Sequence, residues 1–466
     1  MAADPFSRRR FMKMLTAGLV AISSVAQISC RSFSKKPNIL LILSDDAGFA
    51  DFGFQGSQDI PTPNIDKLAE NGIVFTDAHT TSTVCSPSRA GIMTGRYQQR
   101  FGHEANVPPP GHGMDPDELT LAQALNALNY KTAIFGKWHL GQGEKFHPNN
   151  RGFDEFYGLL GGSRSYFPSK KQDQPGKPQA VMHNDKYVTF KGYFTDVLGE
   201  KTVEFIEANK DRPFFIYLSF TAVHTPMQAK KEHLQMFKNH PRPTLAAMTW
   251  SMDENVGKVI KALEKNDLLD NTLIFFTNDN GGSPFNHSSN VPLKGWKGNK
   301  FEGGQRVPFI VQWKDHLKGG RKFSGLTSTL DIFPTAFEIA GGSGSPGKPL
   351  DGVNLLPFLQ GEKKGEPHQV LFWRKEQEAA VRYGDWKLIR LQDYGYVLYN
   401  LKENIGETKN LIEKNPQIFE KMKKLLEEWE AQMKPPAWHE SKPWRDVTWQ
   451  IHKDLMENRI PKKLHP

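Results

Sequence analysis

Short apolar runs constrain the fold of this chain more than any other feature. They cover residues 39–43, 132–135, 214–220 and 273–277, and polar residues follow each run closely. Continuous hydrophobicity, as opposed to alternation, indicates strands buried on both faces, as in a parallel sheet covered by helices. Segments with helical features separate the runs, namely "TPNIDKLAENG", "ELTLAQALNALN" and "TDVLGEKTVEFIEANK". The sequence therefore predicts an α/β fold in which helices sandwich a large, mostly parallel sheet.

The pattern changes after residue 340. "GGSGSPGKP" is rich in glycine and proline, and short strand-like segments follow it, among them "WKLIRL" and "YVLYNL". A helix is expected over residues 416–432. We therefore expect a main domain over residues 37–340. A smaller α+β subdomain over residues 341–466 should carry a short antiparallel sheet and end in a polar and aromatic tail.

Residues 1–36 have the composition of an export signal followed by a linker. Arginines at positions 8–10 precede an apolar stretch that is too short for a comfortable membrane span. "SRRRFMK" resembles a twin-arginine signal. Cys30 lies where a lipoprotein signal carries its cysteine, although Gln27 replaces the usual leucine; the alternative is an ordinary cleaved signal. We expect an exported protein, periplasmic or a lipoprotein at the outer membrane or cell surface, with no membrane contact outside this segment.

Charge and cysteine content exclude two classes of protein. The formal net charge is +9, but residues 1–36 hold seven of the lysines and arginines and one acidic residue, so the remainder carries +3. That is too little for a nucleic-acid-binding surface. The cysteines are Cys30 and Cys85 alone. We therefore expect neither a nucleic-acid partner nor a disulfide framework.

Oxygen-bearing side chains follow two of the predicted strands. Asp45 and Asp46 come after the first run, and Asp279 and Asn280 come after the last. The carboxyl ends of parallel strands meet at one edge of a sheet, where ligands of open α/β sheets bind. Adjacent carboxylates repel unless a cation lies between them, and Ca²⁺ takes this ligand set readily. One aspartate pair alone is more often a solvated loop, but two such pairs predict a metal site.

Proton-transferring or cationic side chains follow other runs. These are Lys137 and His139 after the second run, His224 after the third, and Lys297 in a later loop. Each alone could be a surface residue. Their joint placement predicts a site that handles an anion with several positive charges.

The stretch "TVCSPSRAG" raises the question of what Cys85 does. Pro87 suits the first turn of a helix, so Cys85 is expected at or just before the helix N-terminus, a position that favours anions. Arg89 lies four residues on, on the same face. A phosphatase-like thiolate would need a phosphate-cradling loop, from which Pro87 removes one amide donor. A thiolate also fits poorly among hard carboxylate ligands.

"CSPSRAGIMTGR" resembles the C-x-P-S-R-x-x-x-x-T-G-R signature of type I sulfatases, members of the alkaline phosphatase superfamily. The likeness extends to "NILLILSDDAGFADFG", "GKWHLG", "TNDNGG" and "KFEGGQRVP" and covers residues 37–411. Within the family, the chain is similar to bacterial polysaccharide sulfatases. The resemblance implies that Cys85 is oxidised to formylglycine (3-oxoalanine) by a formylglycine-generating or an anaerobic sulfatase-maturating enzyme. It further implies one Ca²⁺ held by Asp45, Asp46, the modified Cys85, Asp279 and Asn280.

The resemblance also implies the catalytic roles. Arg89 and Lys137 would steady the formylglycine hydrate and the sulfate, and His139 would hydrogen-bond the hydrate. His224 and Lys297 would bind sulfate, and His224 would protonate the leaving alcohol. One oxygen of an aldehyde hydrate attacks sulfur and the other expels sulfate by re-forming the aldehyde, a release that serine could not perform. The metal would lower the pKa of the attacking oxygen.

The implied function is hydrolysis of sulfate esters of a sulfated polysaccharide or its oligosaccharides, by a catalytic domain over residues 37–340. One alternative is a phosphonate or phosphate ester hydrolase on the same scaffold, and another is a non-catalytic protein that binds sulfated glycans. The loops "GRYQQRFGHEANVPP" and "YGLLGGSRSYFPSKK" are expected to line the mouth of the pocket. The candidate substrate contacts are His103, Arg164 and His287.

Overall fold

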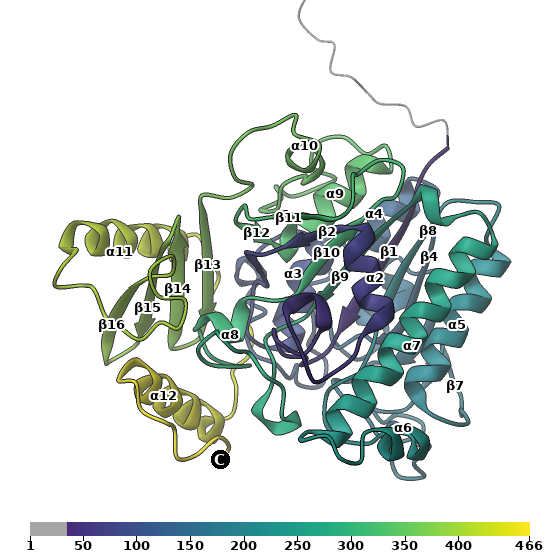
Figure 1. Ribbon diagram of the computed structural model, residues 1–466, viewed down its shortest axis with the longest axis horizontal. Helices are drawn as coiled ribbons and strands as arrows, with labels where there is room; N and C mark the ends of the chain where they lie inside the picture. The colour runs from purple at the N-terminus through teal and green to yellow at the C-terminus, as the bar shows by residue number, and fades with distance from the viewer. Residues whose placement is uncertain (1–34) are drawn as a thin grey trace, which may run out of the picture. The chain divides into compact units, whose positions relative to one another are not determined.

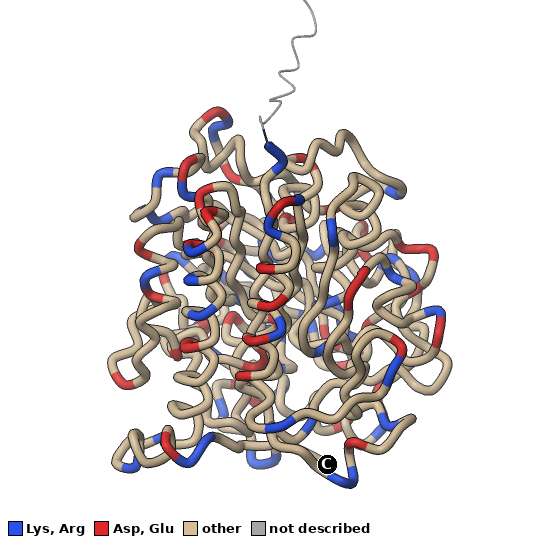
Figure 2. The backbone as a smooth tube through the Cα atoms, turned by 90° about the vertical axis from the view of Figure 1, so that its right-hand side faces the viewer, with Lys and Arg blue, Asp and Glu red and all other residues tan. Residues whose placement is uncertain are grey.

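The computed structural model describes residues 35–466. The predicted export signal, with its arginines and Cys30, lies outside the described residues. Residues 36–466 form one compact unit, and none of the helices described in it is long and apolar enough to cross a membrane. Acidic and basic residues are interspersed on the side shown in Figure 2. The predicted division at residue 341 stays a prediction.

A ten-stranded mixed sheet forms the centre of the described unit (Figure 1). Its middle is parallel, in the order β9 (Thr272–Asn278), β1 (Asn38–Ser44), β8 (Phe214–Ser219), β4 (Lys131–Lys137) and β5 (Glu155–Leu159). These strands are almost wholly buried, as their continuous hydrophobicity predicts. Shorter strands, several of them antiparallel, extend both edges: β11 (Arg321–Phe323), β2 (Ile73–Phe75), β10 (Phe309–Gln312), β6 (Met182–His183) and β7 (Lys186–Tyr187).

Helices cover both faces of this sheet. One layer contains α2 (Pro63–Asn71), α5 (Phe194–Ala208), α6 (Lys231–Met236) and α7 (Pro243–Lys265), and the other contains α3 (Cys85–Thr94), α4 (Leu121–Ala127) and α9 (Ile332–Ile339). The predicted helices begin and end at residues that favour helix ends. Proline opens α2 and Gly72 follows it, whereas Thr120 and Gln123 form a capping box at α4. The helix α7 was not predicted from the sequence.

Short elements complete the main part of the chain. The two-stranded sheet of β3 (Ala78–His79) and β12 (Thr327–Ser328) is parallel. The remaining short helices are α8 (Glu302–Gln305), α10 (Leu356–Leu359), η1 (Gly53–Gln55), η2 (Gln98–Phe101), η3 (Glu144–Phe146), η4 (Pro148–Arg151), η5 (Leu269–Asn271), η6 (Pro284–Asn286) and η7 (Thr329–Asp331).

The C-terminal part contains the predicted short antiparallel sheet, made of β13 (Val370–Lys375), β14 (Glu378–Tyr383), β15 (Trp386–Leu391) and β16 (Gly395–Asn400). Neighbouring side chains point to opposite faces. Val381 and Leu388 pack with α11 (Pro416–Glu430), and Ala380 and Ile389 pack with α12 (Lys442–Met456). The helix α11 was predicted. The expected polar tail instead contains α12, whose apolar residues complete the second face of the sheet.

A buried ionic network joins this small sheet to the rest of the unit. Lys387 of β15 lies 2.8 Å from Glu302 of α8 and 2.9 Å from Glu407, and the side chains of all three are 0 % exposed. Glu302 also lies 3.1 Å from Nε2 of His79, which belongs to β3. Because each charge has an opposite partner, the cost of burying it is offset.

Candidate active site at the carboxyl ends of the central strands

The predicted oxygen ligands lie at one edge of the central sheet. Strands β1 and β9 are parallel neighbours, and Ser44 is paired with Asn278. The residues that follow the two strands therefore leave the sheet side by side, and all are at most 2 % exposed: Asp45, Asp46, Asp279 and Asn280. Asp46 has a left-handed backbone with a φ of 62°, a conformation that non-glycine residues adopt mainly where the surroundings enforce it.

Cys85 is the first residue of α3 and lies against these carboxylates. Its Sγ is 3.5 Å from Oδ1 of Asp45, 3.9 Å from Oδ1 of Asp46 and 3.3 Å from Nζ of Lys297. Burial raises the pKa of the thiol well above its usual range, and the charge of Asp279 raises it further. The thiol is therefore protonated at neutral pH, which makes it a poor nucleophile and a poor metal ligand. This argues against a phosphatase-like thiolate.

Two buried cations lie behind Cys85. Arg89, one turn along α3, donates from Nε to Oδ2 of Asp279 at 2.9 Å and from Nη1 to Oγ of Ser219 at 2.6 Å. The Asp279 carboxylate holds the pKa of Arg89 above its usual value despite burial. Lys137, the last residue of β4, donates to Oδ2 of Asp45 at 2.6 Å. Both side chains are 0 % exposed, and the carboxylates that face them offset the cost of burying two cations.

Lys297 and His224 face the same carboxylate from the open side. Nζ of Lys297 lies 2.7 Å from Oδ1 of Asp46, and Nε2 of His224 lies 3.5 Å from Oδ2. Nδ1 of His224 is 2.7 Å from the carbonyl oxygen of Thr225, to which it can donate, so that Nε2 is the ring nitrogen facing the site. Burial lowers the pKa of His224, Asp46 opposes this shift, and Lys297 adds to it.

His139 lies close by at the end of β4. Its backbone is left-handed, with a φ of 61°, and its carbonyl oxygen accepts a hydrogen bond from Oγ of Ser86 at 2.6 Å. Burial and the charges of Lys137 and Arg89 hold the pKa of His139 well below its usual range, so its imidazole is neutral. A Cβ on Gly162 would lie 2.6 Å from the imidazole, so a residue without a side chain is needed there.

The donor set fits a hard divalent cation. Asp45, Asp46, Cys85 and His224 each offer a ligand atom, and these atoms lie within 4.8 Å of one another. Oδ1 of Asp279 and Oδ1 of Asn280 are buried without a hydrogen-bond partner within residues 35–466. Burial and the charge of Asp45 raise the pKa of Asp279 to about 6. Carboxylates that repel one another, with oxygens left unpaired, are what a cation would stabilise. His224, predicted to bind sulfate, also lies close enough to these atoms to be a metal ligand.

Two hollows of about 350 and 280 Å³ open at this site and share His224, Asn106 and Val107 in their walls. Lys297 lines the larger hollow and His139 lines the smaller one. The two loops predicted to form the pocket mouth do so, through residues 106–108 and 160–163. Asn106 was not singled out from the sequence, where only its place in the first loop pointed to it.

None of the three candidate substrate contacts lines either hollow. His103 is 1 % exposed and lies 2.7 Å from Oγ of Ser86, beside the ring of Trp438. The guanidinium of Arg164 is also buried, bound to Asp173 at 2.7 Å and stacked on Phe190. His287 is exposed but lines neither hollow. The loops reach the site through their small and amide-bearing residues, because the large polar side chains turn inward to satisfy their own hydrogen bonds.

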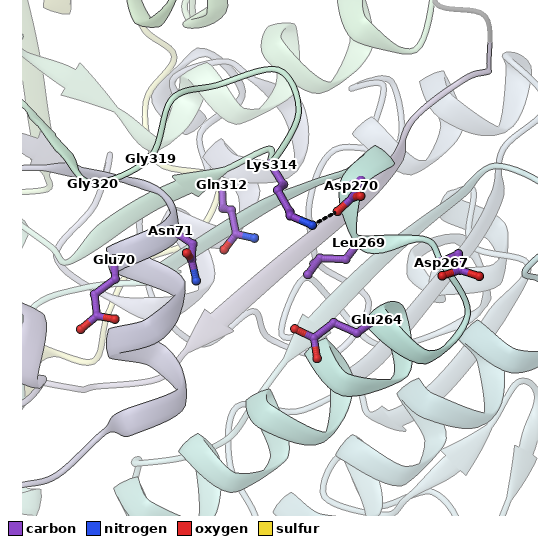
Figure 3. Close-up of a pocket in the computed structure, with 10 residues that line it drawn as sticks. All are labelled: Glu70, Asn71, Glu264, Asp267, Leu269, Asp270, Gln312, Lys314, Gly319 and Gly320. Atoms are coloured by element: carbon purple, nitrogen blue, oxygen red, sulfur yellow. Dashed lines mark hydrogen bonds and ion pairs between the residues drawn. The ribbon is translucent and has the colours of Figure 1, made fainter.

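A hollow of about 540 Å³ lies at the opposite edge of the sheet, before the start of β9 (Figure 3). Acidic side chains line much of it, and its lysine, Lys314, lies 2.5 Å from Asp270. The seven residues of β9 separate this hollow from Asp279, a span of about 20 Å. It takes no part in the chemistry of the site.

The helix-sandwiched sheet, with buried carboxylates and cations at its carboxyl edge, defines a hydrolase of the alkaline phosphatase superfamily. Matches to two protein families identify the kind of hydrolase. The sulfatase family matches residues 37–342, and the C-terminal family of N-sulphoglucosamine sulphohydrolase matches residues 295–432. The chain belongs to the sulfatase family, and the protein is a sulfuric ester hydrolase.

Named relatives agree with this assignment. N-acetylgalactosamine-6-sulfatase of Homo sapiens is 32 % identical over 379 residues, which cover 75 % of this chain and 71 % of the human protein. The crystal structure of Ps i-CgsB in complex with k-i-k-neocarrahexaose is 38 % identical, with a TM-score of 0.83 over 92 % of this chain and 100 % of that one. The PsFucS1 sulfatase of Pseudoalteromonas sp. is 25 % identical, with a TM-score of 0.73 over 93 % and 97 %.

Proposed function

We propose that this sulfatase acts on a sulfated galactan or its oligosaccharides, with formylglycine made from Cys85 and with Ca²⁺. The position of Cys85 is the observation that supports formylglycine chemistry. Its side chain lies at a helix N-terminus, within 3.9 Å of two carboxylates and 3.3 Å of Lys297. As a buried, protonated thiol it has no evident catalytic use, whereas a hydrated aldehyde at this point would face both metal ligands and cations.

The hydrated aldehyde would lie at Cys85, and Ca²⁺ would lie among the oxygen ligands beside it. The hydrated aldehyde would supply one oxygen to attack sulfur and a second to expel sulfate. Ca²⁺ would be held by Asp45, Asp46, Asp279 and Asn280, and it would neutralise sulfate charge and favour deprotonation of the attacking oxygen.

The chain's own residues supply the remaining chemistry. Lys297 contacts both Cys85 and Asp46, so it can bind a sulfate oxygen at the point of attack. Arg89 and Lys137 hold Asp279 and Asp45 in place. Nε2 of His224 faces the open side, where a leaving alcohol would need a proton. His139 is neutral, so it can hydrogen-bond the hydrate without adding a charge.

The substrate class rests on the relatives. The human relative is named N-acetylgalactosamine-6-sulfatase, and the Ps i-CgsB structure holds a k-i-k-neocarrahexaose. Both names denote sugars of the galactose configuration. The hollows at the site provide room beyond a single sulfate group. We therefore propose sulfated carrageenan oligosaccharides as the first substrates to test.

The test is sulfate release from defined oligosaccharides. The full chain is co-produced with a maturating enzyme and incubated with carrageenan and chondroitin oligosaccharides, and free sulfate is measured by ion chromatography. The Cys85→Ala variant is the control. Mass spectrometry of the Cys85 peptide reports conversion of thiol to aldehyde. Release from chondroitin alone would refute the galactan proposal. An unmodified cysteine without turnover would favour the glycan-binding alternative.

A side-by-side assay separates the phosphonate or phosphate ester alternative. Aryl sulfate, aryl phosphate and phenylphosphonate esters are compared at equal concentration with the matured protein. We expect the sulfate ester to have the highest kcat/KM.

We also propose that the protein is exported, because its N-terminal residues have a basic segment followed by an apolar stretch. Fractionation of cells, together with fatty-acid labelling of wild type and Cys30→Ala, distinguishes a lipoprotein from a soluble periplasmic enzyme.

A further inference from the structure

The C-terminal segment, residues 433–466, forms a wall of the larger hollow at the active site. It lies beyond both family matches, which end at residues 342 and 432. Five of its residues nevertheless line that hollow, together with Asp46, His224 and Lys297 of the sulfate site: Glu440, Trp444, Thr448, Ile451 and Leu464. The hollow is therefore continuous with the sulfate site and is built in part by a segment outside the shared family regions.

Exposed apolar side chains gather in this hollow. Trp444 of α12 is 43 % exposed, Phe285 of η6 is 45 % exposed and Val107 is 66 % exposed, and all three line it. His465 of the same C-terminal segment approaches Phe285, with 6.4 Å between the ring centroids. A large aromatic ring left in water costs free energy unless a ligand covers it. One face of a pyranose ring carries C–H groups, which pack on the negative face of an aromatic ring.

A polar pair lies beside these rings. Lys375 is 7 % exposed and lines the hollow, and its Nζ lies 3.7 Å from Oε1 of Glu440. Among the described residues the ammonium has no hydrogen bond, so its donors remain available to a ligand. The same Oε1 accepts a hydrogen bond from the backbone of Asn106 at 2.7 Å, and Oδ1 of Asn106 accepts one from the backbone of Ser86, next to Cys85. Glu440 thus ties the C-terminal segment to the nucleophile's helix.

We propose that residues 433–466 form a second sugar site, which binds the ring adjacent to the sulfated sugar. Trp444 stacks on that ring, and the pair of Lys375 and Glu440 binds its polar substituents. A hollow of about 350 Å³ is large enough for one pyranose unit, since small-ligand sites begin near this size. The proposal rests on the proposed function, because it takes an oligosaccharide as the substrate.

The test compares substrates of increasing length. A sulfated galactose monosaccharide, sulfated neocarratetraose and sulfated neocarrahexaose are assayed with wild type, Trp444→Ala, Trp444→Phe and a control, Tyr187→Ala. Tyr187 is also exposed, at 42 %, but lies on β7 at the far edge of the sheet. For the longer substrates we expect Trp444→Ala to lower kcat/KM by about 30-fold, the loss typical of a buried aromatic contact. The monosaccharide, which has no adjacent ring, should change little, Trp444→Phe should restore most of the loss, and Tyr187→Ala should match wild type. An equal loss at every length, or no loss, would overturn the proposal.

A binding experiment separates this inference from the proposed function. Cys85→Ala and the Cys85→Ala/Trp444→Ala double variant are titrated with sulfated neocarrahexaose in a calorimeter, with inorganic sulfate as the matched small ligand. We expect about 30-fold weaker binding of the hexaose by the double variant and equal binding of sulfate. This outcome supports the sugar site even if wild type releases no sulfate. Equal hexaose affinity of the two variants, or absence of hexaose binding, contradicts it.

Discussion

At the scale of single residues, burial decides what the site can do. Cys85 is 0 % exposed and lies between carboxylates and Lys297. Desolvation penalises its thiolate, so the unmodified cysteine is a poor nucleophile. The pKa of Asp279 is raised in the same way, to about 6, by burial and by Asp45. An aldehyde at Cys85 and a cation beside Asp279, as proposed above, would relieve the cost of burying the two charges.

The first prediction concerns Cys85→Ser. The fold should be retained, because the change is nearly isosteric and leaves α3 intact. Turnover should fall at least about a thousandfold, because a serine ester of sulfate has no elimination route. Intact-protein mass spectrometry, followed by peptide mapping, should detect stoichiometric sulfation of the variant's new hydroxyl. Wild-type turnover in this variant would rule out formylglycine chemistry.

The second prediction concerns Asp279→Asn. The amide retains the size of the carboxylate and one oxygen, but it removes a negative charge from the predicted cation site. Ca²⁺ affinity and kcat/KM should fall together, each by at least about tenfold. Calorimetric titration with Ca²⁺ measures the first quantity. Asp270→Asn, in the acidic hollow at the other edge of the sheet, is the matched control and should leave both unchanged.

At the scale of secondary-structure elements, α8, β15 and β3 depend on one another through buried charges. Lys387 lies between Glu302 and Glu407, with all three side chains 0 % exposed. Breaking such a group leaves carboxylates uncompensated, which costs more than the intact group contributes.

The third prediction follows from this geometry. Lys387→Met should lower the free energy of unfolding by about 3–5 kcal/mol, since it removes the buried cation that lies 2.8 Å from Glu302 and 2.9 Å from Glu407. Urea denaturation followed by tryptophan fluorescence measures the change. Lys424→Met removes an exposed i,i+4 partner of Glu428 and should have no measurable effect. A small change in Lys387→Met would show that the network is dispensable for stability.

The fourth prediction concerns pH. Nε2 of His368 lies 2.7 Å from Oδ1 of Asp331 in η7, and this carboxylate raises the pKa of His368 although burial opposes the shift. A raised folded pKa means that the imidazolium stabilises the fold. This contribution is complete below the ordinary histidine pKa of 6.5 and is lost as the pH rises through the higher folded pKa.

His368→Gln should remove that part of the pH dependence. Urea midpoints of wild type and variant, measured on both sides of neutrality, should therefore converge as the pH rises. Parallel curves would mean that His368 does not titrate with folding.

At the scale of the whole molecule, we expect the unpaired oxygens and repelling carboxylates to couple stability to a bound cation. A ligand that binds the native state alone adds about 2.7 kcal/mol at 100 times its dissociation constant. The fifth prediction is that chelation lowers the melting temperature and abolishes activity, and that Ca²⁺ restores both better than Zn²⁺, because the donors are hard oxygens. Differential scanning fluorimetry with each ion provides the measurement. Better recovery with Zn²⁺ would contradict the predicted ligand set.

Much of the fold and of the site could be predicted because the signals are local. Continuous apolar runs predicted the buried parallel strands. The residues that follow these strands, such as Asp45 and Asn280, had to emerge at one edge of the sheet. Pro87 placed the start of α3 at Cys85. The helix α7 and the helix α12 were missed, because their apolar residues are spread among polar ones and their stability comes from packing on other elements.

The sequence by itself determined the fold class, the carboxyl-edge location of the chemistry and the identity of its charged residues, since strand burial and chain connectivity dictate these. Only the tertiary structure decided which polar side chains face the pocket. His103 and Arg164 lie in the predicted loops but turn inward, because buried polar groups must be paired. Asn106 and Trp444 line the larger hollow, from segments far apart in the chain. Contacts between such distant segments arise when the chain folds, and no local pattern encodes them.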